Sequence, residues 1–197
     1  MASSGRDPDA GLTAEEFGAR FQTDARVLWT LAAGLLGDPT EAEDVCQEAF
    51  LAAYGKRQRF EPGTNFLAWM GRFVRNVATN ELRKRARRQT ASTDPVELDR
   101  GTAFEGTVAR PEHELYDREE FDERLLAGLR ELGEVPRACL LLRTLRELSY
   151  SEIAALLEVP EGTAMSHVHR ARLALRAKLD PTLERARPHG VRPGMQP

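Results

Sequence analysis

The sequence predicts an all-α protein made of two small helical domains joined by a flexible linker. Apolar residues recur at three- and four-residue spacing along most of the 197-residue chain, and no segment has the alternation and short turn of a β-hairpin. The helical pattern disappears between residues 89 and 110, where Thr, Ser, Asp, Gly and Pro accumulate. A chain of this length has room for two small domains.

These patterns divide the chain into five segments. Residues 1–12 are small and polar, and we expect them to be disordered. Residues 13–88 form an N-terminal domain, residues 89–110 an acidic flexible linker and residues 111–180 a C-terminal domain. Residues 181–197 are rich in Pro and Gly and are expected to form a loose tail.

The first predicted helix of the N-terminal domain begins after Thr13, which has capping-box spacing to Glu16, and ends at Gly37. Its predicted buried stripe consists of Phe17, Phe21, Leu28, Leu31 and Leu35. Asp38 caps the second helix, which has a proline in its first turn and runs to Tyr54.

The third helix of the N-terminal domain is predicted over about residues 65–88. Its expected inward residues are Phe66, Met70, Phe73, Val77 and Leu82. The C-terminal domain is predicted to begin with one helix from near residue 111 to Leu132, followed by another over 137–148 that Pro136 opens.

A short helix then starts at Ser149, where Glu152 completes a second capping box. Pro160 and Gly162 predict a turn, and a last helix is expected over 161–179. Its inward stripe is Val168, Ala171, Leu175 and Leu179, and its outward side chains are Ser166, His167, His169, Arg170 and Arg176. A short capped helix, a turn and a basic second helix are typical of a helix-turn-helix that enters the DNA major groove. The alternative is an ordinary helical hairpin with a solvated basic face.

Composition excludes several classes of function. The four histidines have no nucleophile or metal-ligand pattern around them and no glycine-rich phosphate loop is present, so we expect no catalytic residue, no cofactor and no metal site. The two cysteines, Cys46 and Cys139, are expected to be small buried hydrophobic residues. No apolar run reaches the roughly 20 residues of a membrane span, and no signal-peptide core is present, so we expect a cytoplasmic protein.

The formal net charge is −3, but the charge is segregated into a basic stretch at 72–88 and an acidic one at 94–123. The second helix carries Glu41, Asp44 and Glu48 with Gln47 on one face, and the apolar Phe50 and Leu51 lie outside its inward face. A carboxylate face beside apolar residues suits a basic protein partner. The alternative is a solvated acidic face.

The third helix carries cations and asparagines on one face, with aromatic residues at its N-terminal end. The residues are Phe66, Trp69, Arg72, Arg75, Asn76, Thr79, Asn80, Arg83 and Arg87, preceded by Phe60, Thr64 and Asn65. Cations bind phosphates, asparagine can read a base edge, and aromatic rings stack on unpaired bases, so this face favours a melted strand. Alternatively the aromatic residues belong to the core and the arginines are solvated.

The acidic linker either occupies a channel built for nucleic acid or is a soluble tether.

Three motifs together resemble the extracytoplasmic-function (ECF) sigma factors, which are two-domain bacterial transcription initiation factors of the sigma-70 superfamily. Asp38-Pro39 with residues 42–50 resembles the polymerase-binding helix, and residues 65–70 through Asn76 to Arg83 resemble the helix that binds the minus-ten promoter element. Residues 149–154, 162–163, 166 and 170–172 resemble the helix-turn-helix that binds the minus-35 element.

The resemblance implies roles for particular residues. The coiled coil of the largest polymerase subunit would be bound by Asp44, Gln47, Glu48 and Phe50. The minus-ten DNA would be bound by Phe60, Thr64, Asn65, Trp69, Arg72, Arg75, Asn76, Asn80 and Arg83, with the 60–65 loop and Asn76 holding a flipped base. The minus-35 DNA would be bound by Thr163, Ser166, His167, His169, Arg170 and Arg172.

The resemblance also implies core RNA polymerase, promoter DNA and an anti-sigma factor as partners, and a linker that threads toward the RNA exit path. The family usually has cations where this chain has Met165 and His167, so the promoter sequence is not carried over.

Two other functions remain possible at this point: a helix-turn-helix regulator that does not replace a sigma subunit, and a protein-interaction module. Because the linker leaves the two domains without a fixed spacing, we expect the isolated chain to bind promoter duplex weakly.

Overall fold

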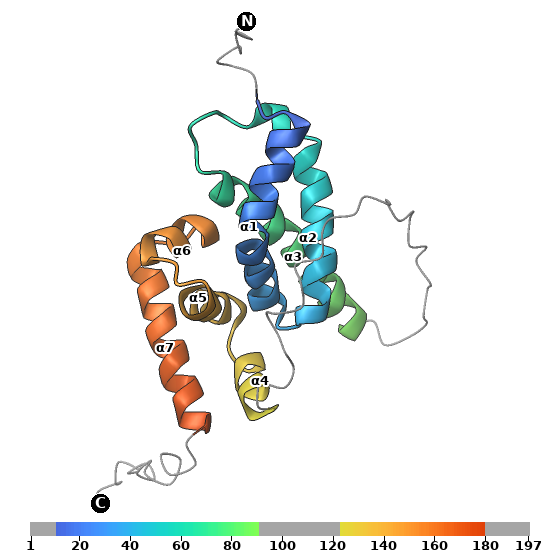
Figure 1. The fold of residues 1–197 in the computed structure, drawn as a ribbon. Coiled ribbons are helices and arrows are strands. Elements are labelled where there is room, and N and C mark those ends of the chain that lie inside the picture. Colours follow the sequence, from blue (N-terminus) through green and yellow to red (C-terminus); the bar gives the residue numbers. More distant parts are fainter. Residues whose placement is uncertain (1–10, 91–122, 180–197) are drawn as a thin grey trace, which may run out of the picture.

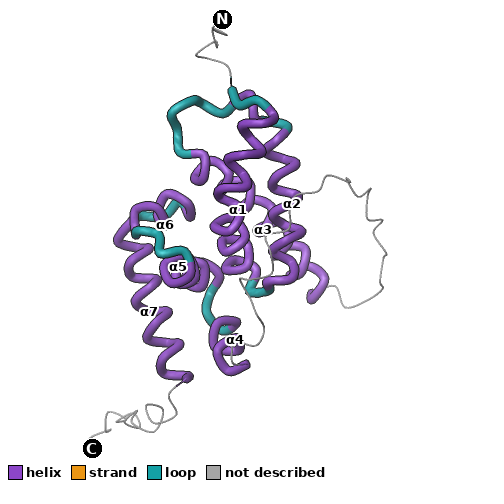
Figure 2. The backbone as a smooth tube through the Cα atoms, in the orientation of Figure 1, coloured by secondary structure: helices purple, strands orange, loops and turns teal. Residues whose placement is uncertain are grey.

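The computed structural model describes residues 11–90 and 123–179, and in these ranges the chain folds into helices without any strand (Figures 1 and 2). The N-terminal domain contains α1 (Ala14–Leu36), α2 (Pro39–Tyr54), a 3-10 turn (Arg57–Arg59) and α3 (Phe66–Thr90). The C-terminal domain contains α4 (Glu123–Arg130), α5 (Glu134–Leu145), α6 (Tyr150–Leu157) and α7 (Glu161–Leu179). The predicted all-α class is confirmed. The expected N-terminal disorder, the linker and the tail lie outside the described residues.

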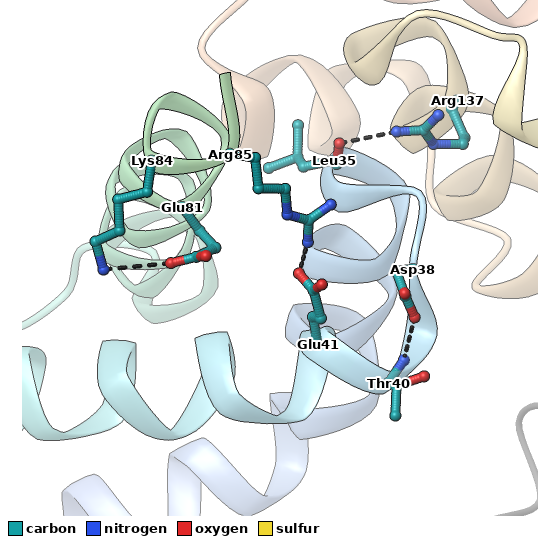
Figure 3. Close-up of polar contacts among 8 residues, drawn as sticks. All are labelled: Leu35, Asp38, Thr40, Glu41, Glu81, Lys84, Arg85 and Arg137. Carbon is teal, nitrogen blue, oxygen red and sulfur yellow. Dashed lines mark hydrogen bonds and ion pairs between the residues drawn. The ribbon is translucent and has the colours of Figure 1, made fainter. Parts of the chain in front are cut away.

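The helix ends of the N-terminal domain follow their local chemistry as predicted. Thr13 and Glu16 form the capping box of α1, and Gly37 ends the helix with a left-handed φ of 73°. The Asp38 side chain accepts a hydrogen bond of 2.9 Å from the Thr40 N–H at the start of α2 (Figure 3). Asn65 caps α3, because its Oδ1 accepts from the Ala68 N–H at 3.0 Å.

The inward stripe of α3 differs by one position from the predicted one. Val74 is fully buried, whereas Phe73 is only half-buried and packs edge-on against Trp69 with 4.8 Å between ring centroids. Leu82 is also half-buried. An aromatic ring can pack sideways against a neighbouring ring, so spacing alone does not decide which of two adjacent apolar residues enters the core.

Two helix boundaries in the C-terminal domain also differ. The part of the first helix that the structure describes ends at Arg130 rather than Leu132, and α5 runs from Glu134 to Leu145 rather than over 137–148. Pro136 lies inside the first turn of α5, where a proline costs no hydrogen bond. Glu147 then takes a left-handed φ of 55°, which ends α5 before Leu148.

The turn of the helix-turn-helix contains Pro160 as predicted, but Glu158 rather than Gly162 supplies its left-handed conformation. Glu158 caps α6 with a left-handed φ of 55°, and the main-chain oxygen of Pro160 accepts the first hydrogen bonds of α7. Gly162 lies within α7 and not in the turn. In α7, Val168 and Ala171 are buried as predicted, but Leu179 is 38% exposed.

The two domains pack against each other, contrary to the expectation that they lack a fixed spacing. Figure 1 shows α5 and α6 on the side of α1 that faces away from α2, and the main contacts between domains join α1 to α5 and α3 to α6. The buried residues of both domains form one continuous hydrophobic cluster. Every residue from Thr30 to Leu36 in α1 is buried, and α1 packs against α2 and α3 of its own domain and against α5 of the other.

Arg137 at the start of α5 joins the two domains. Its side chain is buried, and it donates to main-chain oxygens of Gly34 at 2.6 Å and Leu35 at 2.8 Å, at the C-terminal end of α1. It also donates to the oxygen of Leu132 at 3.0 Å, just beyond α4. A cation at the ends of two helices satisfies carbonyl groups that have no partner within their own helix.

Candidate nucleic-acid and protein interfaces

The outer face of α2 carries the predicted acidic surface. Asp44, Gln47 and Glu48 are exposed, and Leu51 beside them is 49% exposed. The opposite face packs into the core through Ala42, Val45, Ala49 and Ala53. These small residues bring α2 close to its neighbours and hold its polar face outward.

Two residues that sequence reasoning placed at this surface have other contacts. Glu41 forms an ion pair with Arg85 of α3 and so joins two helices of the domain (Figure 3). Phe50 is half-buried, with its ring centroid 4.8 Å from that of Phe21 and 5.2 Å from that of Phe17. Part of Phe50 remains available to a partner, while Leu51 is the large apolar side chain that this face exposes most.

The rings at the N-terminal end of α3 belong to an aromatic cluster that fills this end of the N-terminal domain. The cluster comprises Phe17, Phe21, Phe50, Tyr54, Phe60, Phe66, Trp69 and Phe73. Phe60 is 2% exposed, so its ring offers no surface on which a base can stack. Trp69 is half-buried, so part of its side chain remains accessible.

The loop before α3 holds two predicted DNA-binding residues at its surface. Thr64 is exposed, and its hydroxyl donates to the main-chain oxygen of Glu61 at 2.7 Å. Asn65 is exposed, although its side-chain oxygen is used to cap α3. Gly63 has a φ of 87°, a conformation that glycine adopts without strain.

One face of α3 presents the predicted cations and amides to solvent. Arg72, Asn76, Asn80 and Arg83 are exposed at helical spacing on the side opposite Met70 and the rest of the core. No acidic residue interrupts this face along the helix, so it is a suitable surface for a phosphate backbone.

Arg75 differs from the other cations of α3, because the C-terminal domain covers it. Its side chain is 15% exposed and forms an ion pair of 2.6 Å with Glu158, and it also donates to the main-chain oxygen of Leu156. Arg72 lies one turn earlier and contacts the same Glu158 carboxylate at 3.4 Å. Sequence reasoning had no signal for this pairing, since it depends on how the two domains meet.

The second helix of the helix-turn-helix, α7, exposes most of the predicted minus-35 residues. Ser166, His169, Arg170 and Arg172 are exposed, and Thr163 is half-buried in the first turn. The Arg170 guanidinium turns back along the helix, where its Nε donates to the Ser166 oxygen at 3.3 Å and its Nη2 lies 3.4 Å from Nδ1 of His167.

The charge of His167 depends on its surroundings. Partial burial and the neighbouring cation of Arg170 lower the pKa of His167 below its ordinary value of 6.5. At neutral pH the imidazole is therefore uncharged, and Arg170 supplies the positive charge at this point of α7. Met165, one turn before His169 on α7, is 52% exposed.

The thiols behave as apolar side chains. Burial, with the Glu43 charge as a smaller cause, raises the pKa of Cys46 to about 12, and burial raises the pKa of Cys139 to about 11.

Across residues 11–90 and 123–179, no three His, Cys, Asp or Glu side chains gather in a way that could hold a metal ion. None of the described helices has the length and apolar character needed to cross a bilayer.

Sequence reasoning missed the contacts between domains, although one signal pointed to them. Residues 30–36 are apolar or small on every side of α1, and a helix that is apolar all round is buried on more than one side. Arg137 gave no such signal, because a lone arginine in a first turn is usually solvated.

The N-terminal domain and the helix-turn-helix each correspond to a known family. Residues 21–88 match the family Sigma-70 region 2, and residues 122–175 match the family Sigma-70, region 4. The two matched families therefore define a two-domain sigma-70 protein.

Curated relatives show to which group of sigma factors the chain belongs. The RNA polymerase sigma-H factor of Pseudomonas aeruginosa is 35% identical over 154 residues, which cover 76% of this chain and 78% of that protein. The ECF RNA polymerase sigma-E factor of Escherichia coli is 35% identical over 149 residues, which cover 74% of this chain and 77% of that protein. The chain belongs to the ECF sigma factors, transcription initiation factors that bind core RNA polymerase and direct it to promoters, and it is not an enzyme. The regulator and interaction-module alternatives are thereby set aside.

Solved structures share the fold. The sigma factor RpoE in complex with the anti-sigma factor NepR from Bartonella quintana has a TM-score of 0.61 and 25% identity, covering 84% of this chain and 98% of that chain. CnrH in complex with the cytosolic domain of CnrY has a TM-score of 0.56 and 22% identity, covering 85% of this chain and 89% of that chain.

Proposed function

We propose that three surfaces divide the work of this sigma factor. The acidic face of α2, with Asp44, Gln47 and Glu48, binds core polymerase at the coiled coil of its largest subunit. The outer face of α3 binds the melted minus-ten strand, and the outer face of α7 binds the minus-35 duplex. The observation that carries this division is the segregation of charge: α2 exposes carboxylates, whereas α3 and α7 expose arginines.

At the polymerase surface, exposed Leu51 supplies the apolar contact that half-buried Phe50 supplies only in part. The minus-ten strand is contacted by the exposed residues Thr64, Asn65, Arg72, Asn76, Asn80 and Arg83 and by the accessible part of Trp69. Arg75 joins them only when the C-terminal domain no longer covers it. Phe60 acts indirectly, because its buried ring lies 5.4 Å from that of Trp69 and holds it in place. In α7 the contacts come from Thr163, Ser166, His167, His169, Arg170 and Arg172.

The same proposal assigns the remaining segments and partners. Residues 13–88 form the polymerase and minus-ten domain, residues 111–180 the minus-35 domain, and the acidic stretch at 89–110 passes toward the RNA exit path. Similarity to a sigma factor crystallised with its anti-sigma factor supports an anti-sigma factor as a further partner. Its action on RNA polymerase supports a cytoplasmic location.

Charge reversal on α2 tests the polymerase surface. The double variant Asp44→Arg, Glu48→Arg places like charges against a basic partner, so it should no longer co-purify with core polymerase while its helicity stays normal. The double variant Glu15→Arg, Glu134→Arg is the matched control, because it changes net charge equally at two exposed positions on other helices. Binding of core by the α2 variant at the parent's level would show that the polymerase surface lies elsewhere.

Leu51→Ser separates apolar contact from charge at the same face. Because Leu51 is 49% exposed, the substitution should leave the free energy of unfolding within about 0.5 kcal/mol of the parent. It should still weaken core binding, since apolar anchors contribute much of the binding energy of an interface.

A further inference from the structure

We propose that the free chain holds itself closed, with the Glu158 carboxylate paired with covered Arg75 and competing with DNA for exposed Arg72, so that both arginines bind DNA more weakly than in an opened chain. This inference rests on the proposed role of α3 in binding the minus-ten strand. It assigns a regulatory task to Glu158, a residue at the turn of the helix-turn-helix.

The contacts at Arg75 and Arg72 carry the inference. Glu158 Oε1 lies 2.6 Å from Nη2 of Arg75 and 3.4 Å from Nε of Arg72. Arg75 additionally donates to the oxygen of Leu156 and is 15% exposed, so a phosphate cannot reach its guanidinium unless α6 moves away. The carboxylate and the carbonyl oxygen take the positions that phosphate oxygens would take on the same donors.

The facing surfaces fit closely enough to make the closed arrangement specific. A Cβ atom at Gly71 of α3 would collide with the Leu156 side chain, and Leu156 is 1% exposed. A Cβ atom at Gly34 of α1 would lie 2.6 Å from the Cα of Ala138. Two glycines therefore allow α5 and α6 to approach the N-terminal domain.

Polar bonds fix the orientation of these surfaces. Arg137 donates to Gly34 and Leu35, and Arg146 Nε donates to the Thr30 hydroxyl at 2.8 Å. An apolar contact with matched polar partners on both sides specifies one arrangement, rather than a loose collapse of two domains.

The exposed fraction of Glu158 makes the contact reversible. Its side chain is 57% exposed, so solvent and salt screen the ion pairs, and a polyanion or a partner that separates the domains can replace them. Glu158 also takes a φ of 55°, which places it at the tip of the turn directly after α6.

Removing the charge at Glu158 tests the contact. The probe is a fluorescein-labelled single-stranded DNA of mixed sequence, about twelve nucleotides long, titrated with the full chain at one fixed salt concentration. Glu158→Gln should raise affinity for this strand by about three- to tenfold, because it removes the carboxylate that competes for Arg72 and weakens the contact that keeps α6 over Arg75. Glu147→Gln is the matched control, since Glu147 is an exposed glutamate with the same φ of 55° in the same domain, and it should leave affinity unchanged.

A bulky side chain inserted between α3 and α6 tests the closed arrangement of the domains without changing any charge. Gly71→Leu places a side chain against Leu156, so it should separate α3 from α6, increase the radius of gyration in small-angle X-ray scattering and raise affinity for the same strand. Gly18→Leu is the control, because no atom lies within 4 Å of a Cβ added to that glycine of α1. Unchanged scattering and unchanged affinity for both Gly71→Leu and Glu158→Gln would overturn the inference.

Arginine substitutions in the Glu158→Gln background distinguish this failure from failure of the proposed DNA surface. Arg72→Ala with Arg75→Ala should return the affinity of Glu158→Gln to the parent's value or below it. If the arginine variant lowers binding but Glu158→Gln does not raise it, the DNA surface stands and the closed arrangement does not restrain it. If the arginine variant has no effect, the strand binds elsewhere and the inference fails with the assignment of α3.

Discussion

The Arg137 guanidinium donates to the main-chain oxygen of Leu35 at 2.8 Å, which ties the first turn of α5 to the last turn of α1 (Figure 3). The two residues are 102 positions apart in the sequence. A buried cation that serves carbonyl groups of both domains makes their stabilities interdependent, and this has a measurable consequence.

Arg137→Met should destabilise the chain by about 2–4 kcal/mol, because it keeps much of the apolar stem but leaves buried carbonyl oxygens without donors. The measurement is urea unfolding of the full chain followed by circular dichroism. Arg130→Met, at an exposed position on α4, is the control and should stay within about 0.5 kcal/mol of the parent. Equal midpoints for the two variants would show that Arg137 has little part in joining the domains.

Asn76→Ala should impair opening of the minus-ten region while leaving recognition of the duplex intact, because Asn76 is an exposed amide on the α3 face proposed to bind the melted strand. Permanganate footprinting of the holoenzyme on promoter DNA reads unpaired thymines directly. Thr23→Ala, an exposed substitution on α1, should melt DNA like the parent. Parental melting by Asn76→Ala would remove this residue from the site.

Arg170→Ala should weaken holoenzyme binding to promoter duplex by about 1–3 kcal/mol, because it removes the fixed cation beside an uncharged His167. The loss should appear only with DNA that contains the minus-35 element, in a binding titration at constant salt. Arg176→Ala changes the same residue type two turns further along α7 and should have a smaller effect. A loss of equal size on DNA without the element would assign Arg170 to general phosphate binding.

Glu152→Gln should destabilise the chain at pH 7 by about 0.5 kcal/mol, an effect of the size of a first-turn carboxylate. The Ser149 hydroxyl and then the Ser149 N–H donate to the Glu152 carboxylate and lower its pKa below the ordinary 4.5. A lowered pKa stabilises the folded state above pH 4.5, and this stabilisation is lost as the pH falls through the folded-state value.

Parent and Glu152→Gln should therefore unfold at different urea concentrations at pH 7 and converge in acid below pH 4.5. Ser151→Ala, which leaves the capping box intact, should follow the parent across the range. A difference between parent and Glu152→Gln that stays constant with pH would contradict the role of the ionised carboxylate.

Helices and caps could be predicted from the sequence because their causes are local. Thr13 with Glu16, Asp38 with Pro39, and Ser149 with Glu152 satisfy helix ends through neighbours three residues away or fewer, and all three lie where the sequence placed them. The exposed faces of α3 and α7 follow from helical periodicity in the same way.

The packing between domains could not be predicted, because it depends on residues that are distant in sequence. Glu158 looks like an ordinary turn residue until α6 lies against α3, and Arg75 looks like one cation among several until Glu158 and Leu156 cover it. Position in the core has the same limitation, as Phe60 and Val74 show: periodicity identifies apolar residues, and three-dimensional neighbours decide how deeply each is buried.

The all-round burial of α1 near Gly34 also bears on how long an open molecule can persist in water. Moving α5 away would wet the apolar surface around Gly34 and Ala138, both of which are buried when the domains meet. Uncovered apolar surface favours association with any available hydrophobic surface, including that of another copy of the chain. We therefore expect opened molecules to self-associate as their concentration rises. By keeping this apolar surface buried, the docked arrangement of the two domains protects the free chain against aggregation.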